Sequence, residues 1–250
     1  MKRILLTTVS LGVLGLLSPV YGADLPTYSK APVLRAAVYD WSGFYVGVFG
    51  GGGYGNHNVN DAFGNTGAAN FTANYSSTGG VGGGEAGYNW QSGSYLVGLE
   101  GDVFWSGIKG NDASASPRAP FPSSRSIRII FAGGGTVRVR SGFTVDRWLM
   151  FFTGGYAFGD IAHSNTDPVL GVDRFTVHAN GLTAGAGFAY AITNNVIGKF
   201  EYRYYNFNGY NRAGTPLTVN GQLPYTTEST YSVVTIGLDF KFGGPVVAKY

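Results

Sequence analysis

The sequence predicts an all-β protein, an eight-stranded antiparallel transmembrane up-and-down β-barrel. Three observations support this prediction. Segments in which apolar and polar residues alternate recur along the chain, short and long connections alternate between them, and an export signal precedes them. The composition agrees, because 41 glycines without a triplet repeat are not collagen, and 15% aromatic residues argue against simple disorder.

The first 22 residues have the pattern of a secretory signal peptide. Lys2 and Arg3 form a charged start, an apolar stretch follows, and Val20 and Gly22 are small enough to precede a cleavage site. We expect cleavage after Gly22. The alternative is a membrane anchor, but the apolar stretch is shorter than the roughly 20 residues that a spanning helix needs.

The rest of the chain divides into three predicted parts. Residues 23–42 are a proline-containing lead-in expected in the periplasm, residues 43–242 are the barrel, and residues 243–250 are a periplasmic tail. The eight predicted strands span residues 43–53, 80–90, 95–107, 134–145, 148–160, 181–192, 196–207 and 231–242.

The last predicted strand alternates most clearly. Its apolar set is Val234, Ile236, Leu238, Phe240 and Phe242, and its other set is Thr235, Gly237, Asp239 and Lys241. A period of two places these sets on opposite faces of a strand. We expect the apolar face to contact lipid and the charged face to line the lumen. This strand should also close the barrel against the one that begins near Gly43.

The connections indicate a membrane protein. Three are only a few residues long, whereas about 54–79, 108–133, 161–180 and 208–230 are long and rich in Gly, Asn, Ser, Thr and Pro. Such alternation around an even number of strands is typical of an outer-membrane barrel with short periplasmic turns and long outer loops. A soluble barrel is the alternative, but its connection lengths need not alternate, and aromatic residues at the strand ends favour the membrane.

Ten charged residues fall on the predicted inner faces. They are Glu85, Glu100, Asp102, Glu201 and Asp239, with Arg138, Arg140, Lys199, Arg203 and Lys241. An eight-stranded barrel is just wide enough for its side chains to fill it, and a buried charge without a partner costs several kcal/mol. We therefore expect the charges to pair, with Glu100 and Asp102 next to Arg138 and Arg140. A conducting pore lined by the same charges is the alternative.

Four motifs resemble a known family. WSGFYVG (residues 41–47), GTVRVR (135–140), TGGYAFG (153–159) and LDFKF (238–242) are similar to segments of the alphaproteobacterial outer-membrane surface-antigen family, RopB-like small barrels of the opacity and OmpA type. The resemblance implies a surface-exposed, often antigenic barrel. It also implies assembly by the outer-membrane insertion machinery, which would read Phe240 and Phe242 as an assembly signal. Here an eight-residue tail follows Phe242.

The function expected from this reasoning is that of an outer-membrane structural or surface protein that supports the envelope and presents loops. A small porin-like channel and a haem- or host-ligand-binding protein are the alternatives. The expected partners are outer-membrane lipid and lipopolysaccharide, the assembly machinery and periplasmic chaperones during biogenesis, and a host ligand at the loops.

Other classes of function are not expected. Without Lys2 and Arg3, 15 basic residues face 14 acidic ones, which gives no electrostatic case for nucleic acid. Cysteine is absent, so there is no thiolate nucleophile or Cys-based metal site. His57, His163 and His178 fall in the expected long connections, where they form no catalytic or haem-binding signature. We expect no catalytic, metal or cofactor site.

Overall fold

A computed structural model describes residues 39–61, 71–112, 126–167, 171–212 and 225–243. All of them belong to the larger of two compact units, Val38–Tyr250. The expected signal peptide, its cleavage site, most of the lead-in and the tail lie outside the described residues. Among those described, no helix has the length and apolar character needed to cross a membrane.

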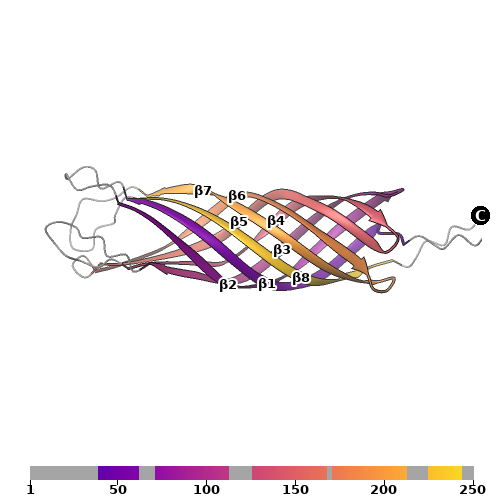
Figure 1. Ribbon diagram of the computed structural model, residues 1–250, viewed down its shortest axis with the longest axis horizontal. Helices are drawn as coiled ribbons and strands as arrows, with labels where there is room; N and C mark the ends of the chain where they lie inside the picture. Colours follow the sequence, from indigo (N-terminus) through magenta and orange to yellow (C-terminus); the bar gives the residue numbers. More distant parts are fainter. Residues whose placement is uncertain (1–38, 62–70, 113–125, 168–170, 213–224, 244–250) are drawn as a thin grey trace, which may run out of the picture. The chain divides into compact units, whose positions relative to one another are not determined.

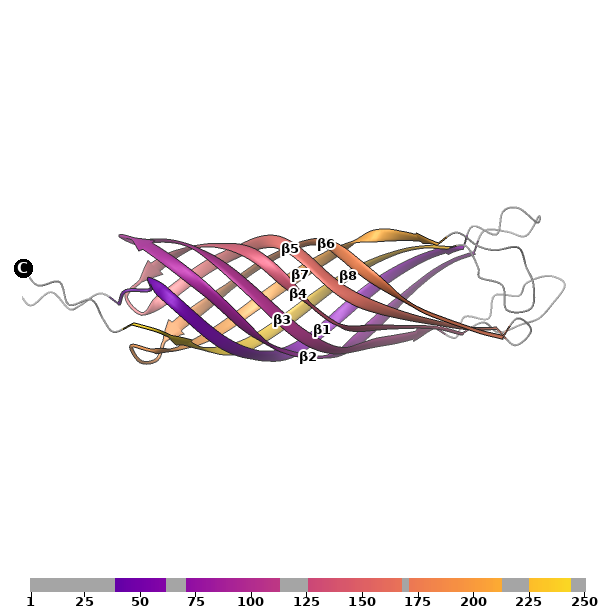
Figure 2. The ribbon, with the colours of Figure 1, turned by 180° about the vertical axis from the view of Figure 1, so that it is seen from behind.

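Eight strands follow one another along the chain (Figure 1). Their bounds are β1 Gly43–Asp61, β2 Phe71–Ser92, β3 Tyr95–Asp112, β4 Ser126–Val145, β5 Trp148–Asp167, β6 Gly171–Ala191, β7 Val196–Arg212 and β8 Tyr225–Lys241. Each pairs antiparallel with its neighbours in the sequence, and β1 also pairs with β8, where Val48 lies opposite Leu238. The sheet is therefore a closed barrel with tilted strands (Figure 2). The predicted fold class is confirmed.

Three tight turns define one end of the barrel, here named the turn end. They join Ser92 to Tyr95, Val145 to Trp148 and Ala191 to Val196. Two turn residues have left-handed backbone conformations, Gly93 with φ 60° and Asp146 with φ 51°. Glycine adopts this conformation without steric cost, and aspartate tolerates it better than most residues. The opposite end, where the four other connections leave the strands, is named the loop end.

The strands reach further toward the loop end than predicted. β1 continues to Asp61 rather than to residue 53, and β4 begins at Ser126 rather than at residue 134. The predicted strands of 11–13 residues correspond to the part that crosses hydrocarbon, where alternation is sharp. Beyond it, the outward residues are mainly polar or charged, among them Asn56, Asn58 and Arg128, so the sequence there reads as a loop.

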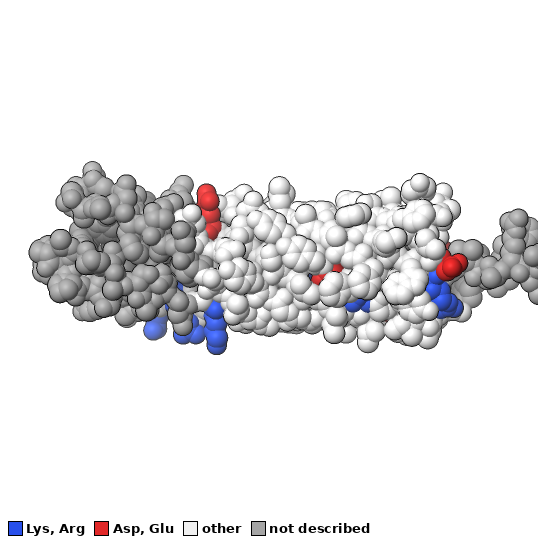
Figure 3. All heavy atoms as spheres, in the orientation of Figure 1, with Lys and Arg blue, Asp and Glu red and all other residues white. Residues whose placement is uncertain are grey.

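The outward side chains form an apolar belt between two aromatic girdles. On β3, Tyr95 and Trp105 are 71% and 74% exposed, and Val97, Leu99 and Val103 lie exposed between them. Ten residues span roughly 33 Å along a strand, or about 25 Å along the axis at a tilt of about 40°, which matches the apolar band of outer-membrane barrels. Figure 3 shows this surface almost free of charged side chains between the ends of the barrel.

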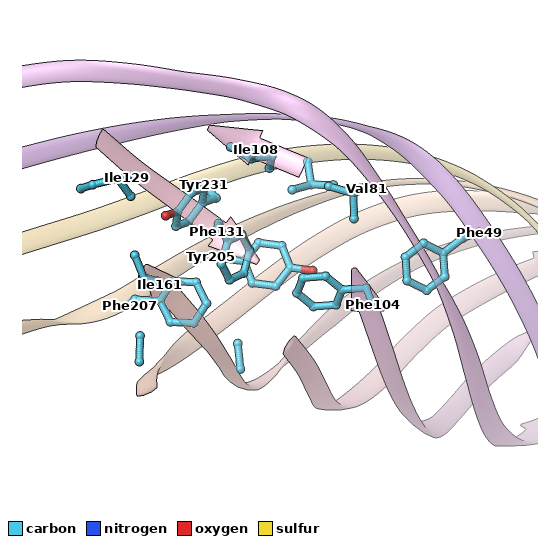
Figure 4. Close-up of a cluster of buried hydrophobic side chains, with 13 residues drawn as sticks. Phe49, Val81, Phe104, Ile108, Ile129, Phe131, Ile161, Tyr205, Phe207 and Tyr231 are labelled. Atoms are coloured by element: carbon cyan, nitrogen blue, oxygen red, sulfur yellow. The ribbon is translucent and has the colours of Figure 1, made fainter. Parts of the chain in front are cut away.

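The lumen is filled in layers, whose order can be followed along β7. Ile197 belongs to an apolar turn-end cluster, Lys199, Glu201 and Arg203 lie in the middle, and Tyr205 and Phe207 belong to an apolar loop-end cluster. The turn-end cluster comprises Tyr39, Trp41, Leu96, Leu149, Phe151, Ala189, Ala191 and Ile197. The loop-end cluster comprises Phe49, Val81, Phe104, Ile108, Ile129, Phe131, Ala157, Ile161, Ala179, Tyr205, Phe207, Tyr231 and Val233. The rings of Phe131, Tyr205, Phe207 and Tyr231 lie close together, and that of Phe49 lies apart from them (Figure 4).

We expect a charge in the middle of the belt to destabilise the barrel more than the same charge at a girdle. Leu99→Arg should lower the free energy of unfolding in liposomes by about 2–4 kcal/mol, and Tyr95→Arg, on the same face of the same strand, by about 0–1 kcal/mol. Denaturant titration followed by tryptophan fluorescence measures both values. Equal losses at the two positions would contradict the assignment of the belt.

Candidate functional site: the luminal charge layer

The structure places all ten predicted luminal side chains inside the barrel, each no more than 5% exposed. Eight of them form one continuous ion-pair network, named here the charge layer: Glu85, Glu100, Asp102, Arg138, Arg140, Lys199, Glu201 and Arg203. The network contains four acids and four bases. Strands β2, β3, β4 and β7 supply them, because each strand directs alternate residues inward.

Arg138 on β4 joins the two sides of the lumen. Its guanidinium binds Glu100, lies 3.1 Å from the Asp102 carboxylate on neighbouring β3, and lies 2.6 Å from Glu201 on β7. Arg140 reaches Glu100 at 3.4 Å. The pairs expected between neighbouring β3 and β4 are present, and the contact with Glu201 crosses the barrel, which no neighbouring-strand argument predicts.

Two bases on β7 complete the network. Lys199 binds Glu85 and lies 3.6 Å from Glu100. The Arg203 guanidinium lies 2.8 Å from Glu201, 3.1 Å from Asp102 and 3.3 Å from Glu85. Each acid of the charge layer therefore contacts at least two bases, which offsets the cost of burying it.

Asp239 and Lys241 on β8 lie apart from these pairs. Lys241 is at the turn end, where its ammonium donates to the backbone carbonyls of Asp40 and Ser42 and lies 4.8 Å from the Tyr39 ring. Asp239 lies beside Gly47 on β1, close enough that a Cβ on Gly47 would overlap its carboxylate. Within the described part of the chain, Asp239 and Lys241 are the two of the ten that lie outside the ion-pair network.

The charge layer also uses uncharged residues that the sequence analysis did not select. The Tyr45 hydroxyl donates to Glu100 at 2.5 Å, and the Thr136 hydroxyl donates to Asp102 at 2.5 Å. Arg140 stacks 3.8 Å from the Phe151 ring, and Arg203 lies 4.8 Å from that of Phe49. These two rings belong to the turn-end and loop-end clusters, so cation–π contacts join all three layers of the lumen.

Glycines make room for the charged side chains. A glycine lies directly across from eight of the ten luminal charges in a neighbouring strand: Gly47, Gly87, Gly98, Gly155, Gly185, Gly187 and Gly237, with Gly47 serving both Glu85 and Asp239. At Gly155, opposite Arg138, a Cβ would lie 2.1 Å from the Val137 carbonyl oxygen. These inward glycines of β1, β2, β3, β5, β6 and β8 thus leave the volume that the long side chains of their neighbours occupy.

Three of the acids form the arrangement most similar to a metal site. Carboxylate oxygens of Glu85, Glu100 and Glu201 lie within 4.8 Å of one another. However, Lys199 contacts all three, and Arg138 and Arg203 contact two each. Side-chain cations already occupy the position that a metal ion would take, so the donor set does not fit a bound cation.

The histidines lie in strands and not in loops, which corrects the sequence analysis. His57 on β1 is buried, and its ring nitrogens lie 3.0 Å from the Ser229 hydroxyl and 2.8 Å from that of Ser77. His163 on β5 is buried and stacks on Phe175. His178 on β6 points outward and bonds Asp160 at 2.6 Å. The error follows from the underestimated strand lengths.

Family comparison agrees with this architecture. Residues 29–242 match the family model described as the outer membrane protein beta-barrel domain. The chain belongs to this family. The match covers all eight strands and ends at Phe242, the last aromatic residue of the closing strand. The chain is accordingly an outer-membrane surface protein.

Curated relatives of the family come from alphaproteobacteria. The chain is 32% identical to the 22 kDa outer membrane protein of Rhizobium leguminosarum bv. viciae over 178 residues, which cover 71% of this chain and 69% of the relative. It is 29% identical to the 25 kDa outer-membrane immunogenic protein of Brucella canis over 214 residues, covering 85% and 84%. The resemblance noted in the sequence is therefore confirmed.

Among solved structures, the chain is similar to the Escherichia coli outer membrane protease OmpT. The TM-score is 0.47 and the identity 11%, and the match covers 80% of this chain and 97% of that one. Likeness at this level carries no argument about activity.

Replacing Arg138 alone should lower the free energy of unfolding more than replacing Arg138 together with an acidic residue of the charge layer. We expect Arg138→Met to lower the free energy of unfolding by about 3–5 kcal/mol, because three buried carboxylates lose a partner. The double variant Arg138→Met/Glu201→Gln keeps acids and bases equal in number and should recover part of that loss. A double variant less stable than Arg138→Met in the same denaturant titration would contradict the charge-balance argument.

Two adjacent glycines on β5 provide a matched test of luminal space. Gly155→Ala should destabilise the barrel by about 1–3 kcal/mol through overpacking against β4. A Cβ on outward-facing Gly154 meets nothing within 4 Å, so Gly154→Ala should change stability by less than about 1 kcal/mol. Urea titration of both variants in the same lipid measures the difference. Equal effects would show that the inward glycines are not spacers.

Proposed function

We propose that this outer-membrane protein is a closed, non-catalytic barrel that supports the envelope and presents its loop-end connections outside the cell. The observation that carries the proposal is that two buried apolar clusters and the charge layer between them follow one another along the described lumen. The turn end would then face the periplasm and the loop end the exterior, in the orientation of outer-membrane barrels with short periplasmic turns.

The turn end is filled by residues that precede the first strand. Trp41 is 1% exposed inside the barrel mouth and packs edge-on against Tyr39, with ring centroids 5.0 Å apart. The Trp41 backbone N–H donates to the Gln91 side chain at 2.7 Å, and the Tyr39 hydroxyl donates to the Asn194 carbonyl at 3.2 Å. Burial raises the pKa of Tyr39 to about 12, so its hydroxyl remains a neutral donor at physiological pH.

The middle and the loop end are filled as well. The charge layer crosses the lumen through the Arg138–Glu201 and Arg203–Asp102 pairs. Beyond it, Phe131 stacks on Tyr231 with centroids 4.5 Å apart and contacts Phe104 and Phe207 at 5.6 and 5.4 Å. A path for water would have to displace both the ion pairs and the rings, which supports a structural role over conduction.

The haem-binding alternative gains no support from the histidines. His178 lies on the outer surface, on the opposite side of the barrel wall from His57 and His163. The three rings therefore do not converge on one face. Within the residues that the structure describes, no arrangement of side chains favours haem, a catalytic centre or a host ligand.

Three expectations about biogenesis remain part of the proposal. Signal peptidase would cleave after Gly22, leaving a lead-in that ends in the barrel mouth. The insertion machinery would read Phe240 and Phe242, and periplasmic chaperones would be partners of the chain during biogenesis. Both rings are exposed, 47% and 46%, at the turn end of the closing seam, where a periplasmic machine meets the chain first.

Single-channel recording tests closure. We expect the purified protein in planar bilayers to give no steady conductance, under conditions in which a known porin gives unitary steps. Gly98→Leu and Gly185→Leu direct bulk into the lumen, because a Cβ there meets Asn89 and Thr153 side-chain oxygens at 2.4 and 2.6 Å. Steady openings of the wild type that either substitution abolishes would establish a pore and overturn the closed-barrel proposal.

A further inference from the structure

The outer wall of the barrel has a pocket near the loop end of β3 to β6. Its volume is about 500 Å³, and its lining includes Trp105, Ala132, Gly133, Phe158, Asp160 and His178. The lining residues reach the wall's outer surface, where Trp105 and Phe158 are 74% and 45% exposed. The pocket therefore opens toward the surrounding membrane, and its inner wall includes Phe104 and Ala179 of the buried loop-end cluster.

Two irregularities in the strand register produce this hollow. The β3–β4 pairing shifts between Trp105 and Ile108, and the β4–β5 pairing shifts between Phe131 and Gly133. Such bulges bend a strand locally and are frequent beside functional sites. Between them the wall carries only the small residues Ala132, Gly133 and Gly134, so no side chain covers the hollow between the rings of Trp105 and Phe158.

The depth of the pocket matches the outer lipid–water boundary. Trp105 marks the loop-end girdle of β3, and tryptophan is enriched where hydrocarbon meets head groups. Beside the rings, the Asp160 carboxylate and the His178 ring form a polar edge, 2.6 Å apart. The site thus has an apolar part on the membrane side and a polar part on the water side.

Three basic side chains project outward just beyond the pocket. Arg128 on β4 and Arg174 on β6 lie in one register row, since each is opposite Ser164 of β5. Lys109 on β3 is opposite Ile130, one outward position nearer the pocket. All three are exposed, and Figure 3 shows basic side chains at this end of the barrel.

The outward side chains that the structure describes at this end of β3 to β6 include too few acids to neutralise these three cations. The only acid there is Asp160, which bonds His178. Arg128 and Arg174 are two strands apart, roughly 10 Å, so their guanidinium groups can converge on one anionic group. Arginine is the preferred partner for phosphate, which it can bind with two parallel hydrogen bonds.

We infer that this wall binds a phosphorylated lipid of the outer leaflet. An acyl chain would lie in the pocket between Trp105 and Phe158, and the head-group phosphate would bind Arg128 and Arg174, with Lys109 beside it. The phosphate source is the lipid, because the cations adjoin an apolar pocket at membrane depth. The inference rests on membership of the outer-membrane barrel family and is independent of whether the lumen conducts.

Binding of bis-phosphorylated lipid A to the full chain in detergent, measured by native mass spectrometry, tests this inference. Each basic residue near an anionic lipid surface contributes roughly fivefold to affinity, so Arg128→Gln/Arg174→Gln should weaken binding roughly 25-fold. Ala132→Phe, which fills the pocket, should also weaken binding. Lipid A with its phosphates removed should bind wild type and the arginine variant equally weakly.

A matched control variant makes the same change in net charge on another part of the barrel. Asn56 and Asn58 are exposed at the loop end of β1, which lies across the eight-strand barrel from β5. Asn56→Asp/Asn58→Asp should leave lipid A affinity within about twofold of wild type. The inference is overturned if both double variants weaken binding equally, if Arg128→Gln/Arg174→Gln binds as wild type does, or if phosphate removal has no effect. Displacement of lipid A by millimolar inorganic phosphate would identify a site for the free anion and would also overturn it.

Discussion

Much of the barrel depends on one constraint, that charged side chains buried in a lumen of eight strands need partners. Four acids and four bases meet this constraint by contacting one another in a connected network rather than in isolated pairs. The apolar clusters above and below then exclude water, which strengthens each ion pair and makes the loss of any partner more costly. The lipid-facing belt, by contrast, needs only apolar side chains over a height that matches the hydrocarbon layer.

The sequence predicted the strand number, the closure of β8 on β1 and, for most strands, which residues face lipid. In β5 the apolar run from Leu149 to Phe152 hides the phase. The prediction failed at the loop end, where Asn56 and Asn58 face outward between inward residues and the sequence looks like a polar loop. A pattern was nevertheless present, because Ile129 and Phe131 also point inward at alternate positions, although the register shift between Phe131 and Gly133 puts them out of phase with Arg138 and Arg140. Apolar residues at this end face the lumen, so a rule that assigns apolar positions to the lipid face places them on the wrong side of the wall.

The charge layer could be predicted as a set of residues but not as a set of contacts. Neighbouring strands indicated the Glu100–Arg138 pair, whereas the Arg138–Glu201 contact depends on the width and shear of the closed barrel. Tyr45 and Thr136 were missed because a hydroxyl on an inward position carries no signal of its own. The glycines opposite the charges could have indicated the packing in advance. A glycine across from a long charged residue leaves room for that charged side chain to lie over the neighbouring strand.

The connectivity of the charge layer also bears on the order of folding. Lys199 and Glu85 are 114 residues apart in the chain, and Arg203 and Glu85 are 118 apart. Strands that entered the bilayer one at a time would expose these charges to hydrocarbon before their partners arrived. We therefore expect insertion and barrel closure to proceed together, so that β2, β3 and β4 enter the hydrocarbon with β7 already in place. A barrel of this kind would assemble as one cooperative unit rather than strand by strand.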